Sequence, residues 1–480
     1  MPPVSIPGLS IDDQVTLNFL LNRMDEKVIR NQLRTTYYDA KYRFHDLMIS
    51  TPPRLRDKID MVLDWPAKAV DLLSQRVTID GFVTPESDDP GIEEIWQANS
   101  LDIEAPQGHD SALIHSCAFV WTTLGDVKSG EPPVIVHVVS ARNGTGIWDP
   151  RRRRLSAALQ VVDRSVEGGD PTLMVMALPD RVVTLEKLPG GRWTVDVRSH
   201  SLGYVPVEVL PYRPNLDRPF GRSRISRTIM SLTDAALRTV VRSEVGAEFF
   251  AAPRIAALNT PKDAFENGGW DAVTSHALVI DAPDADDVDA DPQWQPSITQ
   301  LAQVSMQPHV EQLRMFATLF ASASELPLDA VGIVQDNPSS AEAIEKAEKN
   351  LALEAERTAK VFGRGWIRGM RTAWMLQNGT TDASALDGLE VVWRNPRMPS
   401  MAAASDAILK QVSTPGLEWI GSTEVALERL GYDRATIRRL LAEKRRAGVS
   451  DLLTKLNAPT PPPADTAPTT EPDGDEPNRA

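Results

Sequence analysis

The densest group of potential metal ligands in the chain is a run of six aspartates within eleven residues. Alternating carboxylates can bind Ca²⁺ in an EF-hand loop, whose sixth position is glycine and whose twelfth is glutamate. With Asp287 at the first position, Pro292 would be the sixth residue and Ile298 the twelfth, which excludes an EF-hand. We therefore expect a solvated acidic loop, with a docking face for a basic partner as the alternative. The six residues are Asp281, Asp284, Asp286, Asp287, Asp289 and Asp291.

Other residue types that perform catalysis do not occur at the spacings that catalysis requires. The sequence has no phosphate-binding loop of the Gly-x4-Gly-Lys-Ser/Thr type, and the glycine-rich positions 144–146 and 190–191 are expected to form hairpin turns. Ser223 follows Gly221 and Arg222 without the second glycine of a nucleophile elbow, so we expect it to cap a helix.

The histidines and the single cysteine do not suggest a metal centre either. Cys117 can form neither an intrachain disulfide nor a thiolate metal site, and its apolar neighbours predict a small buried residue. The seven histidines are scattered without a pair at zinc-binding spacing. They are His45, His109, His115, His137, His200, His276 and His309. The sequence therefore predicts no enzyme, no cofactor and no metal.

Two groups of basic residues could contact an anion. The run 151–154 consists of four arginines, for which we expect a solvated turn between strands, with phosphate contact as the alternative. In the expected helix 221–250, charged residues recur every three or four positions and share one face. This face is solvated or pairs with another subunit, or else it lines a wet, charged channel. Its residues are Arg227, Ser231, Asp234, Arg238 and Arg242, opposite Ile225, Ile229, Leu232, Ala236, Val240 and Val245.

These residues must be positioned by several structural units, because 480 residues exceed what one simple core accommodates. The net charge of -15 disfavours tight static binding to DNA but is compatible with DNA sliding past the protein. The N-terminal residues show no secretory signal, and no apolar run is long enough to span a membrane. We expect the protein in the cytoplasm, or in a particle that is assembled there.

Hydrophobic periodicity predicts an α+β protein that is mainly helical. Positions 117–210 alternate with period two, which indicates a small antiparallel β region, and 277–280 resembles a further strand. The longest helix would extend over about 57 Å, with an apolar stripe from Ile344 to Ala373 and a capping box formed by Ser339 and Glu342. Helices are expected at 11–50, 57–77, 221–250, 303–325 and 340–377, with three short ones in 401–456, and the tail 457–480 is expected to be disordered.

Five segments, taken in order, resemble the portal proteins of tailed phages, in the SPP1-type branch that is common in actinobacterial phages. Each is a weak motif alone, but the ordered set covers residues 35–400. The segments are 62–71 (VLDWPAKAVD) with 76–82 (RVTIDGF), 96–102 (WQANSLD) with 118–120 (AFV), 219–225 (PFGRSRI) with 247–254 (AEFFAAPR), 325–332 (ELPLDAVG) and 336–344 (DNPSSAEAI).

The resemblance implies a multi-domain portal subunit with wing, stem, clip and crown. Residues 1–220 would form the wing, 221–250 and 303–325 the two stem helices, and 251–302 the clip between them. Residues 326–340 would be the tunnel loop at the narrowest point of the channel. Residues 341–400 would form a long wing helix and a return strand, 401–456 a crown and 457–480 a Pro-rich tail.

The resemblance also implies a function without catalysis. Relatives form closed rings, typically of about twelve subunits, at a capsid vertex of the virion. Double-stranded DNA passes through the ring during packaging and ejection, while a separate terminase performs the ATP-driven work. The terminase, the head-tail adaptor, and the capsid and scaffolding proteins would be the partners, and the acidic residues 281–291 would lie near the docking end. The tunnel-loop candidates are Val331, Ile333, Val334, Gln335, Asp336 and Asn337.

Two other functions are the alternatives. One is a virion structural or adaptor protein without a DNA channel, which would not need two stem helices around a small insertion. The other is a nuclease or hydrolase that binds a metal in the Asp-rich loop, against which Pro292 argues.

Overall fold

The computed structural model describes residues 4–42, 61–85, 91–166, 169–251, 255–258, 277–280, 297–300, 305–333, 341–397, 401–432 and 434–456. The chain divides into two compact units, Met1–Met398 and Pro399–Ala480. The first unit mixes helices with mainly antiparallel sheets, and the second is helical where it is described. Within the described residues, no helix is long and apolar enough to cross a lipid bilayer.

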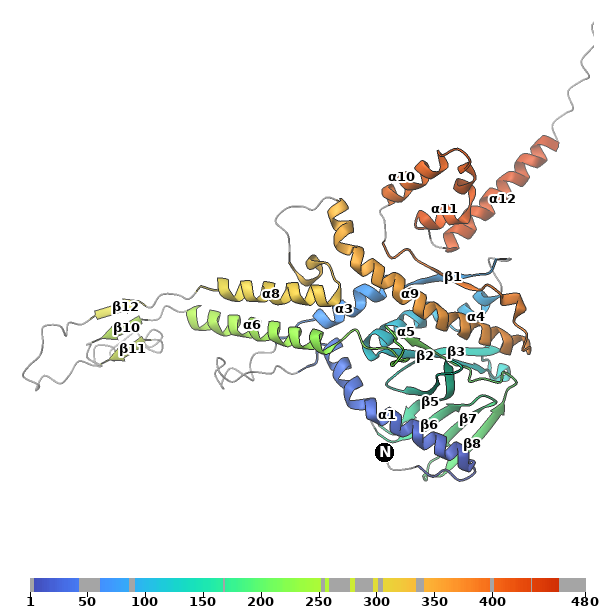
Figure 1. Ribbon diagram of the computed structural model, residues 1–480, viewed down its shortest axis with the longest axis horizontal. Helices are drawn as coiled ribbons and strands as arrows, with labels where there is room; N and C mark the ends of the chain where they lie inside the picture. Colours follow the sequence, from blue (N-terminus) through green and yellow to red (C-terminus); the bar gives the residue numbers. More distant parts are fainter. Residues whose placement is uncertain are drawn as a thin grey trace, which may run out of the picture. The chain divides into compact units, whose positions relative to one another are not determined.

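The N-terminal helix α1 (Ile11–Tyr38) packs on a five-stranded antiparallel sheet (Figure 1). Ser10 caps the helix by accepting a hydrogen bond from the backbone N–H of Asp13 at 3.1 Å. Leu17, Leu20, Leu21 and Met24 are buried against the sheet, as their spacing predicts. The helix ends at Tyr38 instead of residue 50, and residues 43–50 of the expected helix lie outside the described ones.

The five-stranded sheet has the strand order β4-β5-β6-β7-β8. The turn between its last two strands is formed by Gly190 and Gly191, both at positive φ, which confirms the expected hairpin. The expected turn at 144–146 is wrong, because these residues begin a strand. A Cβ at Gly144 would lie 2.9 Å from Cγ1 of Val139, so close packing of strands explains this glycine. The strands are β4 (Gly144–Asp149), β5 (Arg154–Arg164), β6 (Pro171–Ala177), β7 (Arg181–Lys187) and β8 (Trp193–Ser199).

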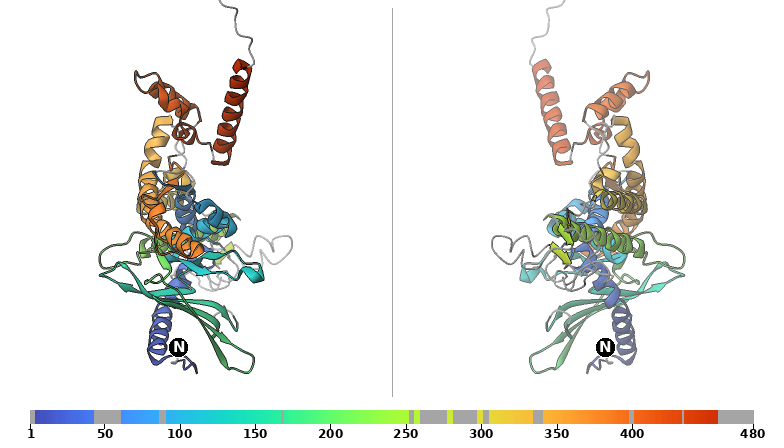
Figure 2. Two further views of the ribbon diagram at one scale, coloured as in Figure 1. Left: turned by 90° about the vertical axis from the view of Figure 1, so that its right-hand side faces the viewer. Right: turned by 90° about the vertical axis from the view of Figure 1, so that its left-hand side faces the viewer.

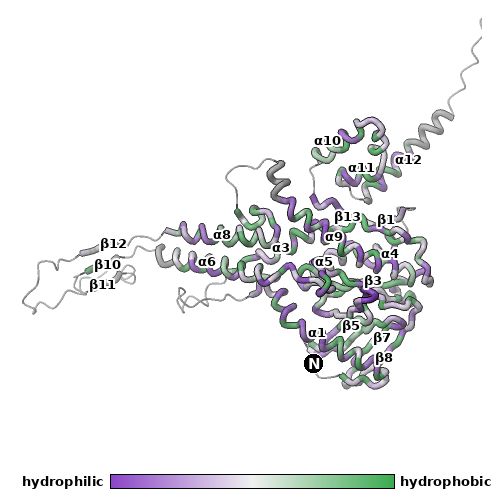
Figure 3. The backbone as a smooth tube through the Cα atoms, in the orientation of Figure 1, coloured by the Kyte–Doolittle hydropathy of each residue, from purple (hydrophilic) through white to green (hydrophobic). Residues whose placement is uncertain are grey.

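A second antiparallel sheet has the order β3-β2-β9, and with the first it makes the β region larger than expected. Its strands are β2 (Cys117–Leu124), β3 (Val134–Ser140) and β9 (Val207–Pro211). Helices α5 (Leu101–His115) and α9 (Ala341–Asn378) pack on it. The long helix is confirmed, and its predicted stripe is buried at Leu351, Ala355, Ala359, Phe362, Trp366, Met370 and Ala373. Figure 3 shows the resulting alternation of hydrophobic and hydrophilic segments along α9.

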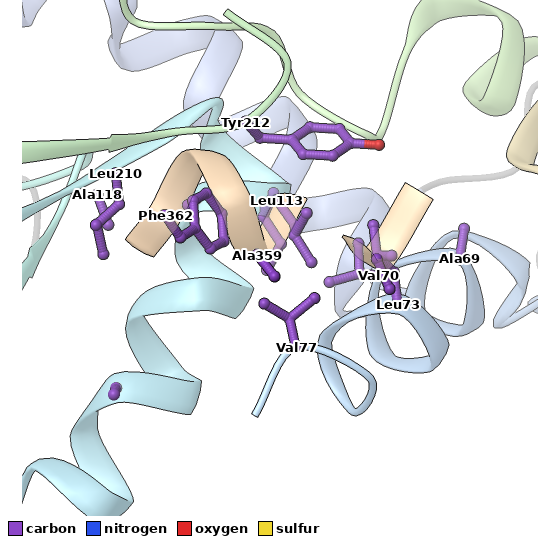
Figure 4. Close-up of a cluster of buried hydrophobic side chains, with 14 of the residues drawn as sticks. Ala69, Val70, Leu73, Val77, Leu113, Ala118, Leu210, Tyr212, Ala359 and Phe362 are labelled. Atoms are coloured by element: carbon purple, nitrogen blue, oxygen red, sulfur yellow. The ribbon is translucent and has the colours of Figure 1, made fainter. Parts of the chain in front are cut away.

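The main core lies where α5 and α9 meet α3 (Trp65–Ser74). Figure 4 shows Phe362 and Ala359 of α9 close to Leu113 of α5, with Val70 and Leu73 of α3 nearby. The helix α3 begins at Trp65 instead of residue 57, and residues 57–60 lie outside the described ones. Pro66 explains the start, because proline lacks an N–H and fits a helix only in its first turn.

Smaller elements complete the first unit. Strand β1 (Ile79–Val83) pairs antiparallel with β13 (Glu390–Trp393), which is the strand expected after the long helix. Helix α4 (Ile92–Ala98) precedes α5, and the 3-10 turns are η1 (Val127–Ser129), η3 (Leu328–Val331) and η4 (Ser384–Leu386).

Helices α6 (Arg227–Ala251) and α8 (Gln307–Ser324) flank a small sheet in the sequence. The sheet has the order β11-β10-β12, in which β10 (Ile255–Leu258) is parallel to β11 (Ala277–Ile280) and antiparallel to β12 (Ser297–Gln300). The strand at 277–280 confirms the prediction.

The second unit contains α10 (Met401–Val412), η5 (Glu418–Ser422), α11 (Glu424–Arg429) and α12 (Arg434–Leu456). Three helices are confirmed, although the third has 23 residues and is not short. Gly416 and Gly431 have positive φ values at the breaks between them. The tail 457–480 lies outside the described residues.

His109 in the main core should make stability depend on pH. Its Nε2 accepts a hydrogen bond from Nε1–H of Trp366 at 2.9 Å, and its Nδ1 lies 3.1 Å from the carbonyl oxygen of Val77. Both contacts are satisfied only by the neutral ring that carries its proton on Nδ1. Burial accordingly lowers the pKa of His109 from 6.5 to about 4.

Because the pKa of folded His109 lies below the ordinary value, the unfolded chain binds this proton more readily. The stability that neutral His109 provides is complete above pH 6.5, and about 3 kcal/mol should be lost as the pH falls to about 4. Urea unfolding at several pH values should give a smaller decrease for His109→Gln than for the unmodified chain. Equal decreases would contradict this role.

Candidate functional site

Helices α6 and α8 form a pair that extends away from the main core of the first unit (Figure 1). The two helices lie side by side (Figure 1) and pack through small residues such as Ala236, Ala317 and Ala321. Oγ1 of Thr239 on α6 hydrogen-bonds to Oε1 of Gln312 on α8 at 3.2 Å. Small side chains allow two helix backbones to approach closely, so the pair forms a narrow arm of two helices.

The charged face predicted on α6 is only partly solvated. Arg227 is exposed, whereas Arg238 and Arg242 are half-buried. The carboxylate of Asp234 accepts a hydrogen bond from the hydroxyl of Tyr37 on α1, at 2.8 and 2.9 Å to its two oxygens. Burial and this bond raise the pKa of the Tyr37 hydroxyl, so Tyr37 remains a neutral donor. Asp234 therefore anchors α6 to α1.

The start of α6 differs from the prediction. The helix begins at Arg227 instead of residue 221, and the backbone N–H of Ile229 donates to Oγ of Ser226 at 3.3 Å. Ser223 is buried and donates to the carbonyl oxygen of Ile114, so it is not the cap that we expected. Gly221 has φ +70°, and a Cβ there would lie 2.1 Å from the carbonyl oxygen of Tyr212. The backbone N–H groups of Arg222 and Arg224 donate to the carbonyl oxygens of Tyr212 and Leu113, both at 2.8 Å, so residues 221–226 lie outside the helix.

Arg224 ties the base of the helix pair to the rest of the unit. Its side chain is 6% exposed and donates to the carbonyl oxygen of Ala69 on α3. It also donates to the hydroxyl of Tyr212 at 2.9 Å and to the carbonyl oxygen of Ser324 on α8 at 2.6 Å. Three neutral acceptors thus surround one buried cation, and they come from three different parts of the chain.

A second arginine joins the end of α8 to α9. The guanidinium of Arg213 donates to the carboxylates of Glu325 and Glu354. Burial would raise the pKa of Glu354, but the hydrogen bond and the charge of Arg213 outweigh burial and lower the pKa. Glu325 follows α8 in the left-handed conformation, with φ 58°. Residue 325 therefore both ends α8 and pairs with Arg213.

The segment after α8 contains the first of the expected tunnel-loop residues. Val331, in η3, is buried and packs in the main core, and Ile333 is partly buried beside it. Val334, Gln335, Asp336 and Asn337 lie outside the described residues. The six aspartates from Asp281 to Asp291 also lie outside them.

The arginine run at 151–154 is divided in the structure. Residues 151–153 form an exposed turn, as expected, but Arg154 belongs to β5 and donates to the carboxylate of Glu208, with its Nη2 at 2.6 Å. Burial raises the pKa of Glu208 despite the nearby charges of Arg154 and Arg368. Arg154 therefore stabilises the fold and is not available to phosphate.

Within the part of the chain that the structure describes, no cluster of His, Cys, Asp or Glu could hold a metal ion. Cys117 is buried, and burial raises the pKa of its thiol to about 12, so it is no activated nucleophile. The described residues offer a mechanical arrangement instead, which is a helix pair anchored at its base by Arg213 and Arg224. Sequence reasoning missed both arginines, because their partners lie up to 155 residues away in the chain.

Comparison with known proteins identifies the family to which the chain belongs. The family model described as "Phage portal protein, SPP1 Gp6-like" matches residues 17–449. The portal protein of Mycobacterium phage L5 is 29% identical over 463 residues, which cover 91% of this chain and 90% of that protein. The portal protein of Mycobacterium phage D29 is 28% identical over 469 residues, which cover 94% and 93%.

Among solved structures, a chain from the neck of an empty GTA particle has a TM-score of 0.43 and 12% sequence identity. The similarity covers 74% of this chain and 87% of that chain.

Proposed function

Because the chain belongs to the SPP1 Gp6-like family of phage portal proteins, we propose that it forms a closed ring through which double-stranded DNA enters and leaves the capsid. The family match extends over residues 17–449, so both units take part in the resemblance. About twelve copies would close the ring, since a subunit with two different complementary sides closes when the rotation between neighbours permits it.

The main structural support for this proposal is the pair of helices α6 and α8. Helices α6 and α8 would be the two stem helices that cross the shell opening, and residues 251–302 would be the clip between them. The described parts of 1–220, with α9 and β13, would form the wing, and 401–456 would form the crown. The family order of segments and the paired helices around a small sheet support this division.

The base of the stem would transmit force between DNA and the ring. Arg213 and Arg224 anchor α8 where the chain continues into residues 326–340, the proposed tunnel loop. The candidate loop residues include no Lys or Arg, so contacts with DNA would be steric or polar without a phosphate clamp. Val331 is buried in the core, which disfavours a contact between its side chain and DNA.

The proposed ring performs no hydrolysis. A terminase would supply the ATP-driven movement and would dock at the clip, where the head-tail adaptor replaces it after packaging. The six aspartates at 281–291 would contribute an acidic docking face for such a basic partner. Capsid and scaffolding proteins would contact the wing, in the host cytoplasm during assembly and at the capsid vertex of the virion afterwards.

Negative-stain electron microscopy with native mass determination tests the proposal. The full chain at modest salt should form rings with a central hole and a mass of about twelve subunits. A chain that remains monomeric even with capsid and scaffolding protein present would contradict the ring. That outcome would instead favour an adaptor without a DNA channel.

A further inference from the structure

Helix α1 has an apolar row on the side that faces away from its core. The exposed fractions are 84% for Ile11, 64% for Val15, 51% for Phe19, 84% for Ile29 and 45% for Leu33. The opposite side of the same helix is buried against the five-stranded sheet through Leu17, Leu20, Leu21 and Met24. A helix that only covered this sheet would need one apolar face. The outer row therefore requires a second explanation.

A stripe of four cations runs beside this apolar row. Arg23, Lys27, Arg30 and Arg34 are spaced by four, three and four residues, which places them on one face of the helix. Arg23 lies over the ring of Phe220 and Arg34 donates to the carbonyl oxygen of His115, so Lys27 and Arg30 are the cations left for a partner. Burial and the charge of Arg30 lower the pKa of Arg34 to about 10, so like charges are crowded here. Within the described residues, Lys27 pairs with Glu26 at 3.5 Å, and Arg30 is exposed. We call Lys27 and Arg30, with the apolar row, the α1 outer face.

A surface of opposite charge lies at the tip of the β2–β3 hairpin and the start of α5. Its exposed apolar residues are Leu124 at 44%, Val127 at 63% and Ile103 at 63%. Three exposed carboxylates, those of Asp102, Asp126 and Glu131, outnumber the one exposed cation of the tip, Lys128, so the surface is acidic on balance. We call the three apolar and the three acidic residues the hairpin patch.

Hydrogen bonds hold the two parts of the hairpin patch together. Nδ2 of Asn99 donates to the carbonyl oxygen of Val134 at 3.1 Å, and Oδ1 of Asn99 accepts from the N–H of Val136 at 2.9 Å. These bonds keep the start of α5 beside β3. The backbone N–H of Asp126 donates to the carboxylate of Glu131 at 2.7 Å, which closes the hairpin tip. The patch is therefore preformed.

The two surfaces face away from each other within the first unit. Figure 2 shows α1 on one side of the unit and the hairpin tip on the other side of the sheets. They cannot meet within one chain, because the sheets and their core lie between them. They are complementary in chemistry, since one joins apolar side chains with cations and the other joins them with carboxylates.

We propose that the α1 outer face of one copy docks on the hairpin patch of the next copy, so that this contact closes the ring. The inference rests on the proposed portal function and names the surface through which its subunits associate. A contact between two different faces is heterologous, and such contacts generate rings when they close. DNA could also neutralise the cations of α1. Its phosphates, however, would leave the apolar row of α1 exposed and would make no contact with the hairpin patch.

Charge reversal in the full chain tests the contact. Variant A is Lys27→Glu with Arg30→Glu, and variant B is Asp102→Lys with Glu131→Lys. Each alone places like charges in every contact of the ring, so the concentration for half-assembly should rise about tenfold or more. Arg151→Glu with Arg152→Glu, in the exposed turn before β5, makes the same change of charge as variant A and should assemble normally.

Mixing the two variants gives the decisive result. In an equimolar mixture, the glutamates of variant A face the lysines of variant B, and the unchanged cations of variant B face the unchanged carboxylates of variant A. Rings should therefore return, with an even number of subunits and equal amounts of the two variants in native mass spectra. Circular dichroism of both variants should match the unmodified chain. Variant A should unfold at the same temperature, and variant B slightly lower, because Glu131→Lys removes the acceptor of the Asp126 N–H; both should be folded at the assembly temperature, which separates assembly from folding.

The possible failures can be told apart. If the unmodified chain forms rings and variant A forms them equally well, the inference is wrong and the proposed function stands. Failure of the mixture to assemble, with both variants folded, also overturns the inference. Normal rings of variant A that bind DNA more weakly would assign the cations to DNA instead. Absence of rings from the unmodified chain would overturn the proposed function and this contact with it.

Discussion

Replacement of Arg224 by methionine should lower the free energy of unfolding of the first unit by about 3–5 kcal/mol. The guanidinium donates to Ala69, Tyr212 and Ser324, and methionine would leave these acceptors without donors in a buried site. A buried acceptor that loses its partner costs about 1–3 kcal/mol. The change should appear as a lower midpoint in urea unfolding followed by circular dichroism.

Arg222→Met is the matched control for this prediction. Arg222 is two residues away and exposed, and its backbone N–H, which methionine would keep, donates to the carbonyl oxygen of Tyr212 at 2.8 Å. Its replacement should change stability by less than about 0.5 kcal/mol. Arg224→Lys should remain strongly destabilised, because an ammonium on a flexible stem does not reproduce the planar set of donors. Equal midpoints for Arg224→Met and Arg222→Met would refute the anchoring role.

Replacement of Glu354 by leucine should cost about 3–5 kcal/mol, because it leaves the half-buried guanidinium of Arg213 without its most buried carboxylate. The side chain of Glu354 is 6% exposed, whereas that of Glu325, the other partner, is 35% exposed. Glu325→Gln should therefore cost less, about 1 kcal/mol or below. Urea unfolding of both variants under the same conditions measures the difference.

A double-mutant cycle isolates the interaction of Glu354 with Arg213. If the two side chains act as a pair, the cost of Arg213→Met with Glu354→Leu should be smaller than the sum of the single costs by about 1–3 kcal/mol. Because the pKa of Glu354 is lowered in the folded chain, its contribution is present at neutral pH. The contribution should disappear as the pH falls through that lowered pKa. If the costs of the two single replacements simply add, Arg213 and Glu354 do not stabilise the fold as a pair.

Both predictions concern the junction between the helix pair and the rest of the unit. In the proposed ring, a weakened junction should also reduce the fraction of chains assembled, since the stem would no longer be held at a fixed angle to α3 and α9. The charge-reversed variants of α1 should instead assemble poorly while remaining stable. Stability and assembly measured on the same samples therefore separate the two roles.

Local pattern was sufficient for the regular elements. The apolar stripe of α9 repeats every three to four residues, and this period alone places Leu351, Phe362 and Trp366 on one buried side. Alternation with period two likewise predicted β3, β6, β7 and β8, because a strand turns successive side chains to opposite faces. The order of short motifs was sufficient to indicate the family, which the match over residues 17–449 confirms.

Helix boundaries were less predictable, because distant contacts decided them. The pattern at 221 suggested a helix start, but Gly221 has φ +70°, and the hydroxyl of Ser223 donates to the carbonyl oxygen of Ile114. The glycines at 144–146 looked like a turn, yet the close approach of Val139 at Gly144 requires a residue without a side chain in a strand. Ile114 lies 109 residues from Ser223 in the sequence, so no local rule includes this contact.

By itself, the sequence determined the helices and strands, the family and the lack of a recognisable catalytic motif, because these depend on the spacing of neighbouring residues. Only the tertiary structure decided which charged side chains hold the helix pair to the rest of the unit. Arg213 pairs with Glu354 across 141 residues, and Arg224 reaches Ser324 across 100. It also decided that the outer face of α1 remains exposed, since period and composition do not distinguish an apolar face buried in one chain from one left for a second copy.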